Sequence, residues 1–216
     1  MSESDNSWNI LEQWFPELST ESWEQLKEYI ALLREWNEKI NLVSRKDMDR
    51  LETKHLAHCL TITNFLRLMP KAQVLDVGTG GGLPGIPLAI CYPQARFTLM
   101  DSIGKKVMAV EDMVKRLNLK NVEIRRGRVE ELPKKRSYDF IIGRAVSALP
   151  TFFGWVNNKI RKGARNSPAN GILYLKGGDY SEELKTSGLH PAKIWNLDEL
   201  LPQAELGEKF LIHFKI

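Results

Sequence analysis

The chain has few cysteines and no long hydrophobic run. Its two cysteines, Cys59 and Cys91, belong to no Cys-x-x-Cys motif and to no Cys/His set with metal-ligand spacing, so we expect reduced thiols and no bound metal. No apolar stretch reaches the roughly 18–20 residues that a bilayer-spanning helix needs. Residues 1–5 are acidic and polar, unlike a secretory signal peptide. These absences argue against a disulfide-stapled secreted fold and against a membrane protein, and favour a cytoplasmic location.

The composition is that of a soluble globular domain, with 43% hydrophobic and 27% charged residues among 216. The formal net charge is +4, and the charges are unevenly distributed. Acidic residues dominate the first two dozen positions, whereas basic residues cluster at 105–106, 115–116, 125–128, 134–136 and 159–165. Basic clusters attract phosphate backbones, but most charged runs are solvated surface. The charge therefore permits nucleic-acid binding without indicating it.

Hydrophobic periodicity divides the chain into two regions. Apolar residues recur at helical spacing over 22–40, and a further helix is predicted over 47–68. From residue 72 onwards strand and helix patterns alternate, which predicts a parallel sheet with helices on both faces. The predicted strands cover 72–77, 96–100, 122–126, 139–143 and 172–175, and the predicted helices 83–91 and 105–117. Residues 210–216 alternate with period two and are interpreted as a closing antiparallel edge strand. We expect a helical region over 1–70 packed on an α/β domain over 71–216.

The most informative segment runs from Val74 to Gly85. An apolar strand pattern ends in Asp76, alternating glycines follow, and then an apolar helix begins. Such a unit forms a nucleotide-sized cradle at the carboxyl edge of a parallel sheet. A dinucleotide-binding Gly-x-Gly-x-x-Gly would have to start at Gly80 and would place Pro84 inside the turn, whereas Asp-x-Gly-x-Gly-x-Gly fits from Asp76. This pattern resembles the S-adenosylmethionine loop of Rossmann-like methyltransferases. The alternative is a glycine-rich turn that binds nothing.

Further candidate site residues follow the other predicted strands. The carboxyl ends of parallel strands meet at one edge of the sheet, so these residues are expected near the glycine loop. Asp101 ends the second strand, where a carboxylate can accept from ribose hydroxyls or simply cap a helix. Val129 and Glu130 follow the third strand and can contact an adenine, although Glu130 can equally be a solvated loop acid. Arg144 follows the fourth strand, where its planar fork can hold a cofactor carboxylate or a substrate phosphate.

Motifs along most of the chain occur in the order of one known family. They are 41–44 (Asn-Leu-Val-Ser), His55, 74–87, 98–102, 105–107, 127–131, 144–145 and 175–177. Over residues 25–216 the chain resembles the glucose-inhibited division protein B (GidB) family, also called RsmG. Members of that family are bacterial methyltransferases that modify the N7 of one guanine in 16S (small-subunit) ribosomal RNA. The resemblance implies a mostly parallel seven-stranded sheet with an antiparallel edge strand, helices on both faces and an N-terminal helical extension.

The resemblance also implies where S-adenosylmethionine binds. The expected cofactor-binding residues are Gly78, Gly80, Leu83, Asp101, Val129, Glu130 and Arg144. One departure from the family is visible: its usual His-x-x-Asp-Ser is replaced by a run from His55 to Cys59 that has His58 in place of the aspartate. The role of that aspartate is therefore in doubt here. From the sequence alone, a structural role is favoured for all four histidines.

Methylation at guanine N7 has modest catalytic requirements. N7 already carries an in-plane lone pair, so we expect no general base and assign no catalytic residue; Arg144 is a candidate for positioning substrate or cofactor. Lys106, Arg128 and Lys176 are candidate RNA contacts, and each can equally be an ordinary surface cation. The implied partner is small-subunit ribosomal RNA or the assembling small (30S) subunit, with no membrane contact, and we expect a monomer.

Two other classes of function stay open at this point. A small-molecule methyltransferase would share the cofactor half of the site, and a non-catalytic binding protein could share the fold, because fold does not choose the methyl acceptor. RNA recognition weakens steeply with salt, whereas recognition of a free metabolite does not. Calorimetry with S-adenosylmethionine tests the non-catalytic alternative.

Overall fold

The computed structural model describes residues 3–135, 137–204 and 206–216. Arg136, part of a predicted basic cluster, and residues 1–2 of the acidic N-terminal segment lie outside the described residues. Within the described part of the chain, no helix has both the length and the apolar character required to cross a membrane.

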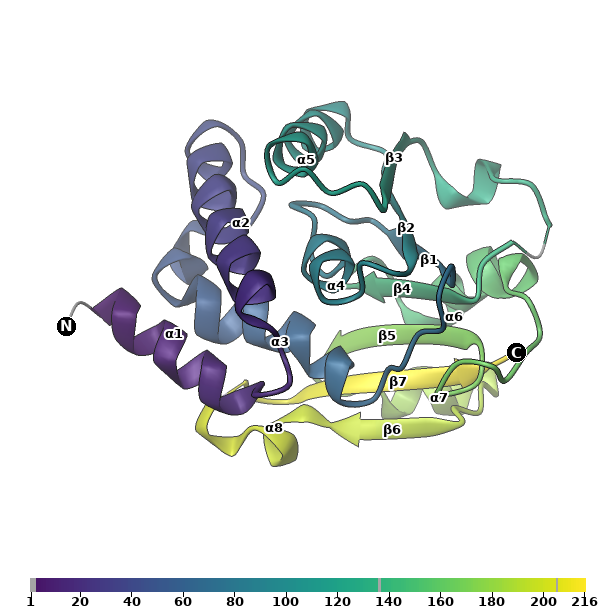
Figure 1. Ribbon diagram of the computed structural model, residues 1–216. Coiled ribbons are helices and arrows are strands. Elements are labelled where there is room, and N and C mark those ends of the chain that lie inside the picture. The colour runs from purple at the N-terminus through teal and green to yellow at the C-terminus, as the bar shows by residue number, and fades with distance from the viewer. Residues whose placement is uncertain (1–2, 136, 205) are drawn as a thin grey trace.

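A seven-stranded sheet organises the chain (Figure 1). Its order is β3-β2-β1-β4-β5-β7-β6, and the pairs from β3 to β5 are parallel. The strands are β1 (Gln73–Val77), β2 (Arg96–Asp101), β3 (Val122–Arg126), β4 (Phe140–Arg144), β5 (Gly171–Gly177), β6 (Lys193–Asn196) and β7 (Lys209–Lys215). The order reverses between β1 and β4, so the carboxyl ends of these two strands border the crevice where such sheets bind ligands.

The fold expected from the sequence is confirmed, with one difference at the sheet edge. The C-terminal strand β7 is antiparallel to β5, as predicted, but it does not form the edge. The edge is β6, a four-residue strand, half-buried from Ile194 to Asn196, that the sequence analysis did not predict. β6 carries no period-two signal, because its two apolar residues, Ile194 and Trp195, are adjacent and three successive residues are half-buried.

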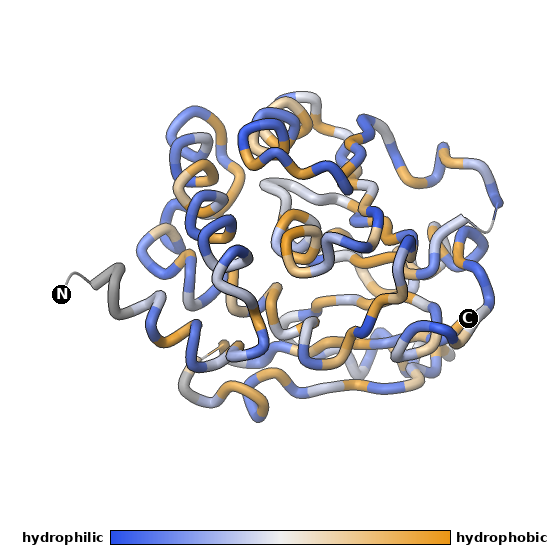
Figure 2. The backbone as a smooth tube through the Cα atoms, in the orientation of Figure 1, coloured by the Kyte–Doolittle hydropathy of each residue, from blue (hydrophilic) through white to orange (hydrophobic). Residues whose placement is uncertain are grey.

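Hydrophobic side chains cover both faces of the sheet. In β4, Phe140 and Ile142 join one buried cluster and Ile141 joins the other, as strand alternation requires. The first cluster packs against α2 (Thr20–Lys39), α4 (Gly85–Cys91) and α5 (Gly104–Arg116), and the second against α6 (Leu149–Val156) and α7 (Ser181–Ser187). The hydrophobic colouring of α4 in Figure 2 agrees with its complete burial from Gly85 to Ile90.

The N-terminal helices share the first of these clusters. α1 (Glu3–Trp14) contributes Leu11, and α2 contributes Trp23, Leu26, Tyr29 and Leu33. The Ser19 hydroxyl caps α2 by accepting from the Ser22 amide at 3.2 Å. The boundary near residue 70 between a helical region and an α/β domain stays a prediction, since one core runs through both.

The helix predicted over 47–68 is helical but broken. A 3₁₀ helix (Arg45–Arg50) leads into a π-helical segment (Leu51–Leu56), then α3 (Ala57–Leu60) and a second 3₁₀ helix (Thr61–Asn64). The Thr61 and Thr63 hydroxyls donate to carbonyls three residues back, which favours the tighter winding at the C-terminal end. The remaining α-helix, α8 (Leu197–Leu200), lies between β6 and β7 in the chain, and short 3₁₀ helices cover Val129–Glu131, Asn157–Lys159 and Pro202–Ala204.

Candidate active site

The glycine loop bends the chain sharply between β1 and α4. Gly78 and Thr79 donate their amides to the Met100 carbonyl, at 2.8 and 3.0 Å, so the loop stays attached to the end of β2. The φ angles of Gly78, Gly80 and Gly82 are +69°, +59° and +91°, a region that residues with a Cβ seldom adopt. The alternating glycines that stood out in the sequence are therefore required by the backbone itself.

Asp76 anchors this loop from beneath. Its Oδ2 accepts from the Thr79 hydroxyl at 2.7 Å and from the Gly85 amide at 3.0 Å. Gly85 is needed for that contact, because a Cβ there would lie 2.6 Å from Oδ2 and 2.2 Å from a Leu99 methyl. Asp76 is fully buried, and its Oδ1 has no hydrogen-bond partner among the described residues. Burial raises the pKa of Asp76 to about 6, against the lowering effect of its two donors.

A carboxyl group with a raised pKa makes stability depend on pH. The pKa of Asp76 is about 6 in the folded protein and 3.8 in the unfolded chain, so the folded protein binds this proton more tightly. Protonated Asp76 therefore contributes to the stability of the folded state at low pH, and this contribution is lost as the pH rises from about 4 to 6. We expect the variant Asp76→Asn, which stays neutral, to gain stability over the parent by about 3 kcal/mol across that window. Urea unfolding of both proteins at pH 4 to 8 measures this. Their difference isolates Asp76, because all other titrations are shared, and a difference that is flat with pH contradicts the prediction.

The N-terminal region contacts the glycine loop directly. The buried Tyr29 hydroxyl of α2 donates to the Gly81 carbonyl at 2.8 Å. A Cβ on Gly81 would come within 2.8 Å of a Leu33 methyl, so the absence of a side chain lets α2 pack against the loop. α2 thus supports the loop from the side opposite the sheet.

A cavity of about 800 Å³ opens at this carboxyl edge of the sheet. Its walls come mainly from the glycine loop, the loop after β4, the end of β5 and the broken helix, with single residues from α5, α7, β7 and the turn before the broken helix. They include Leu42, Asp47, Lys54, His55, His58, Gly78–Gly81, Leu83, Lys106, Arg144–Ala148, Tyr174–Gly177, Glu183 and Lys209. Six of the residues predicted from the sequence are thus brought together, namely Gly78, Gly80, Leu83, Lys106, Arg144 and Lys176.

Asp101 lies next to this cavity, on the far side of the glycine loop. One carboxylate oxygen, Oδ2, accepts from the Gly80 amide at 3.0 Å, and the other, Oδ1, accepts from the Ile103 amide at 2.9 Å. Ile103 is the N-cap residue of α5, and this helix has no side-chain cap hydrogen bond, so Asp101 does not cap it. Each Asp101 oxygen keeps a lone pair that a ribose hydroxyl can use, and the ribose role stays a prediction. The Gly127 amide donates to the Asp101 carbonyl at 3.1 Å and ties the end of β3 to the same place.

The remaining predicted residues follow β3, outside the cavity wall. Val129 is buried, whereas Glu130 and Arg128 are exposed. The Arg128 amide donates to the Glu131 carboxylate at 3.2 Å, which holds this short turn in shape. The roles predicted for these three residues stay predictions.

Arg144 is positioned by a chain of polar contacts from the N-terminal region. Its Nη1 lies 3.2 Å from His55 Nδ1, and His55 Nε2 lies 3.2 Å from Asp47 Oδ2. The other Asp47 oxygen, Oδ1, pairs with Lys54. Arginine can only donate, so Nδ1 accepts and the neutral ring carries its proton on Nε2, facing Asp47. Burial and the Arg144 charge lower the pKa of His55, in agreement with a neutral ring. A structural role is expected for His55 from the sequence, and its contact with Arg144 is not, although His55 belongs to the motifs shared with the family.

The loop after β4 is fixed by β5. Ala145 has a φ of +54°, and the amides of Val146 and Ser147 both donate to the Tyr174 hydroxyl, at 3.1 and 3.2 Å. Lys176 pairs with the Glu183 carboxylate at 2.6 Å inside the cavity wall. Lys176 is thus neutralised in this arrangement, whereas Lys106 has no ion pair with any residue that the structure describes. Neither Tyr174 nor Glu183 was identified from the sequence.

His58 lies in the wall of the same cavity. It is 6% exposed, and its Nε2 has no hydrogen-bond partner among the described residues. Burial, reinforced by the Arg144 charge, holds the pKa of His58 well below its usual value. His58 therefore contributes a neutral imidazole to this cavity wall.

The comparisons with known proteins agree with this geometry. Residues 22–194 match the model of the family described as rRNA small subunit methyltransferase G. The chain belongs to this family. It is 45% identical to the ribosomal RNA small subunit methyltransferase G of Flavobacterium johnsoniae, over 94% of this chain and 96% of that protein. The protein of the same name from Christiangramia forsetii is 47% identical, over 94% and 95% of the two chains.

Solved structures support the fold. A SAM-dependent methyltransferase from Aquifex aeolicus superposes with a TM-score of 0.54 at 19% identity, covering 76% of this chain and 90% of that one. A geranyl diphosphate methyltransferase in complex with SAM gives a TM-score of 0.57 at 13% identity, over 79% and 88% of the chains. At these identities the similarity concerns the fold, and the methyl acceptor has to be argued from the family and the site.

Proposed function

We propose that this protein transfers the methyl group of S-adenosylmethionine to the N7 of a guanine in small-subunit ribosomal RNA, in the cytoplasm where ribosomes assemble. The observation that carries the proposal is the cavity at the carboxyl edge of β1 and β4, built on a methyltransferase-type glycine loop. The match to the rRNA small subunit methyltransferase G family supports the choice of RNA as acceptor.

The residues present suit the cofactor. A Cβ on Gly80 would find only the Gly78 carbonyl within 4 Å, at 3.9 Å, so the loop leaves open space on its cavity side. S-adenosylmethionine supplies a methyl group made electrophilic by a positively charged sulfur. The glycine loop and Leu83 would hold it, Asp101 would accept from its ribose, and Val129 and Glu130 would contact its adenine. Arg144 would donate to its carboxylate, because the Arg144 guanidinium lies in the cavity wall beside Gly78.

The protein groups around the cavity suit a reaction that needs no proton removed from the nucleophile. Of the carboxylates in the cavity wall, Asp47 is engaged by Lys54 and His55, and Glu183 by Lys176 and the Leu149 amide. Neither is free to act as a base on a substrate. The walls therefore serve to orient the base and to exclude water, with Lys106 left available for a phosphate.

Labelled methyl transfer tests the proposal. We expect incorporation from tritiated S-adenosylmethionine into small-subunit rRNA from a strain that lacks this methyltransferase, at one guanine that becomes sensitive to borohydride and aniline cleavage, as 7-methylguanosine is. The RNA from the parent strain, already methylated, is the matched acceptor control and should take up no label. We also expect the apparent KM for RNA to rise by at least tenfold between 50 and 200 mM salt, while cofactor affinity changes little. Transfer to free metabolites without incorporation into RNA contradicts the proposal, and so does an absence of cofactor binding by calorimetry.

A further inference from the structure

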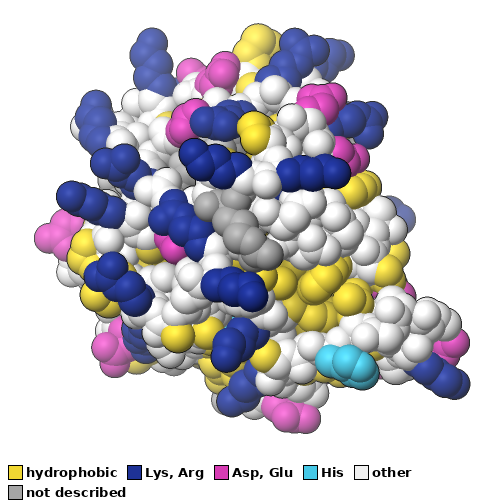
Figure 3. Space-filling view, turned by 90° about the vertical axis from the view of Figure 1, so that its right-hand side faces the viewer, with side chains coloured by type: hydrophobic (Ala, Val, Ile, Leu, Met, Phe, Trp, Pro, Cys, Tyr) yellow, Lys and Arg dark blue, Asp and Glu magenta, His cyan; other side chains and the backbone are white. Residues whose placement is uncertain are grey.

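The end of the sheet opposite the cavity carries a second concave region, visible from the side shown in Figure 3. Two hollows of about 720 and 320 Å³ adjoin there and share Gln73, Thr98 and Glu123. Together they form one groove along the amino ends of β1, β2 and β3. We call it the amino-edge groove, and its charged lining consists of Lys71, Arg96, Lys120, Glu123, Arg125, Lys135 and Arg161.

The amino-edge groove is strongly positive. Its carboxylate, Glu123, is engaged by Arg125 at 2.8 Å, and Arg161 lies 3.9 Å from Asp139. The other basic residues of the groove are exposed and make no ion pair with any described residue; they are Lys71, Arg96, Lys120 and Lys135. In Figure 3, Lys and Arg side chains spread across this face, and Asp and Glu lie mostly around its outline. Positive charge here is therefore available to an outside ligand.

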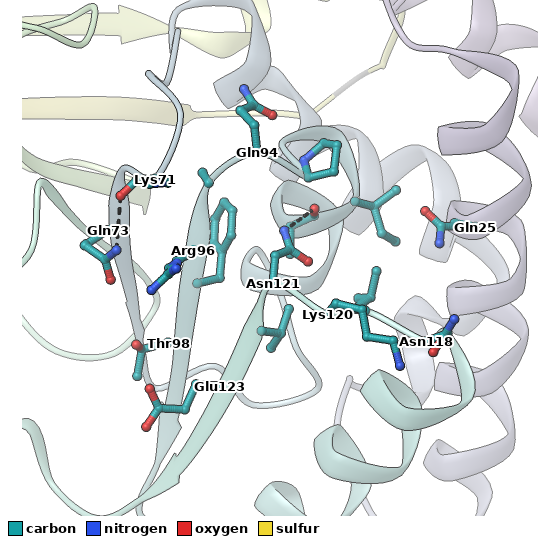
Figure 4. Close-up of a pocket in the computed structure, with 17 residues that line it drawn as sticks. Gln25, Lys71, Gln73, Gln94, Arg96, Thr98, Asn118, Lys120, Asn121 and Glu123 are labelled. Carbon is teal, nitrogen blue, oxygen red and sulfur yellow. Dashed lines mark hydrogen bonds between the residues drawn. The ribbon is translucent and has the colours of Figure 1, made fainter.

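Neutral donors are interleaved with these cations. Figure 4 shows Gln73, Arg96, Thr98 and Glu123 side by side along the strands, with Gln25, Asn118 and Lys120 on the opposite wall. An array of exposed cations and side-chain amides suits the phosphates and sugars of a nucleic-acid backbone. It does not suit a sequence-reading site, which would need polar groups buried in a defined pocket.

The backbone at Lys71 gives a second, independent indication. Lys71 has a φ of +66°, held by its amide donating to the Gln94 carbonyl at 2.8 Å. A residue with a Cβ is strained in this conformation, whereas glycine is not. Strained residues cluster at functional sites, and here the strained residue presents a free cation to the amino-edge groove.

We propose that the amino-edge groove binds the sugar-phosphate backbone of the substrate RNA, as a contact separate from the methylated base. This inference rests on the proposed function. Gln73 at the groove and Val77 beside the cavity are the two ends of β1, about 13 Å apart by strand rise. A single nucleotide does not reach both places, whereas a folded RNA does. The groove then contributes affinity and orientation, and the cavity contributes the choice of base.

A charge-matched pair of double variants tests the amino-edge groove. The test variant carries Lys71→Gly and Arg96→Gln, and the control carries Lys27→Gln and Lys185→Gln, two exposed lysines on α2 and α7. With a full-length small-subunit rRNA transcript, we expect the Kd and KM for RNA to be roughly tenfold or more higher in the test variant than in the parent. The slope of the logarithm of the RNA-binding constant against the logarithm of salt concentration should be smaller in magnitude by about one to two. Its S-adenosylmethionine affinity and its kcat at saturating RNA should equal those of the parent. The control variant should stay within about twofold of the parent in every measurement.

Glycine adopts the conformation of residue 71 without strain, so the test variant should keep the thermal unfolding temperature of the parent within a few degrees. If the test variant binds RNA with the affinity and salt dependence of the parent, the amino-edge groove does not bind RNA. Methyl transfer to RNA by the parent would still support the proposed function in that case. A parent protein that neither binds nor methylates the transcript overturns the proposed function instead. A defect seen with small-subunit particles but not with the naked transcript overturns RNA binding by the groove in favour of a ribosomal protein.

Discussion

Replacing Gly80 with valine is expected to abolish cofactor binding while the protein still folds. The φ of Gly80 is +59°, and a side chain there would point into the open cavity, where a Cβ meets only a carbonyl at 3.9 Å. Valine therefore occupies ligand space and is strained as well, by about 1–2 kcal/mol or more because it is β-branched. Calorimetry with S-adenosylmethionine should show at least a hundredfold weaker binding. Thermal unfolding should shift down by roughly 3–8 °C, as that strain predicts for a chain of this size.

Gly154→Ala is the matched control for this prediction. Gly154 lies exposed in α6, has no positive φ and would place its Cβ with nothing within 4 Å. Alanine should leave cofactor binding unchanged and should stabilise the helix by about 0.5–1 kcal/mol. Cofactor binding of parental strength in Gly80→Val would remove the glycine loop from the proposed site.

The features that the sequence predicted well are those encoded by neighbouring residues. The strand from Gln73 to Val77, the three left-handed glycines and the helix after them form one continuous segment, so their pattern is readable directly. The parallel order of strands then places Asp101 and Arg144 at the same edge without further information. The position of the site follows from these two steps.

The features that the sequence did not predict depend on contacts between distant residues. His55 and Arg144 are 89 positions apart, and Tyr174 fixes a loop 27 and 28 positions before it. Neither contact leaves a periodic signal, because each depends on how the broken helix and β5 pack on the rest. Lys176 shows the same limitation: its basic character is plain in the sequence, but its pairing with Glu183 is decided by the placement of α7. Local chemistry was predictable, and the partners of each group were not.

The contact between His55 and Arg144 leads to the second large effect. Arg144→Ala is expected to lower kcat/KM for methyl transfer about 10- to 100-fold, the loss that follows from removing a hydrogen bond made by a charged group. His55→Ala should cost less, about tenfold, because Arg144 remains but its Nη1 loses the acceptor at 3.2 Å. His55 is thus a positioning residue, and the double variant should be no worse than Arg144→Ala alone. Steady-state kinetics of all four proteins measure this non-additivity.

The pH dependence of activity separates a positioning role of His55 from a merely structural one. Protonation of His55 at Nδ1 removes the hydrogen-bond acceptor for Arg144 and places two positive charges next to each other. Asp47, on the other side of the imidazole ring, favours the protonated form of His55, and the Lys54 charge opposes it. The pKa of His55 lies below its usual 6.5, so activity should be constant around neutral pH and should fall once the pH drops below the pKa of His55. Burial and the Arg144 charge hold the pKa of His58 well below its usual value, so His58 is neutral at neutral pH. Asp76, beneath the glycine loop, also titrates near pH 6, so the comparison is made in the Asp76→Asn background. There the acid limb should disappear in His55→Ala and persist in His190→Ala, which alters an exposed histidine outside the site. Additive losses in the double variant, or an acid limb that survives without His55, would show that Arg144 is held by other groups.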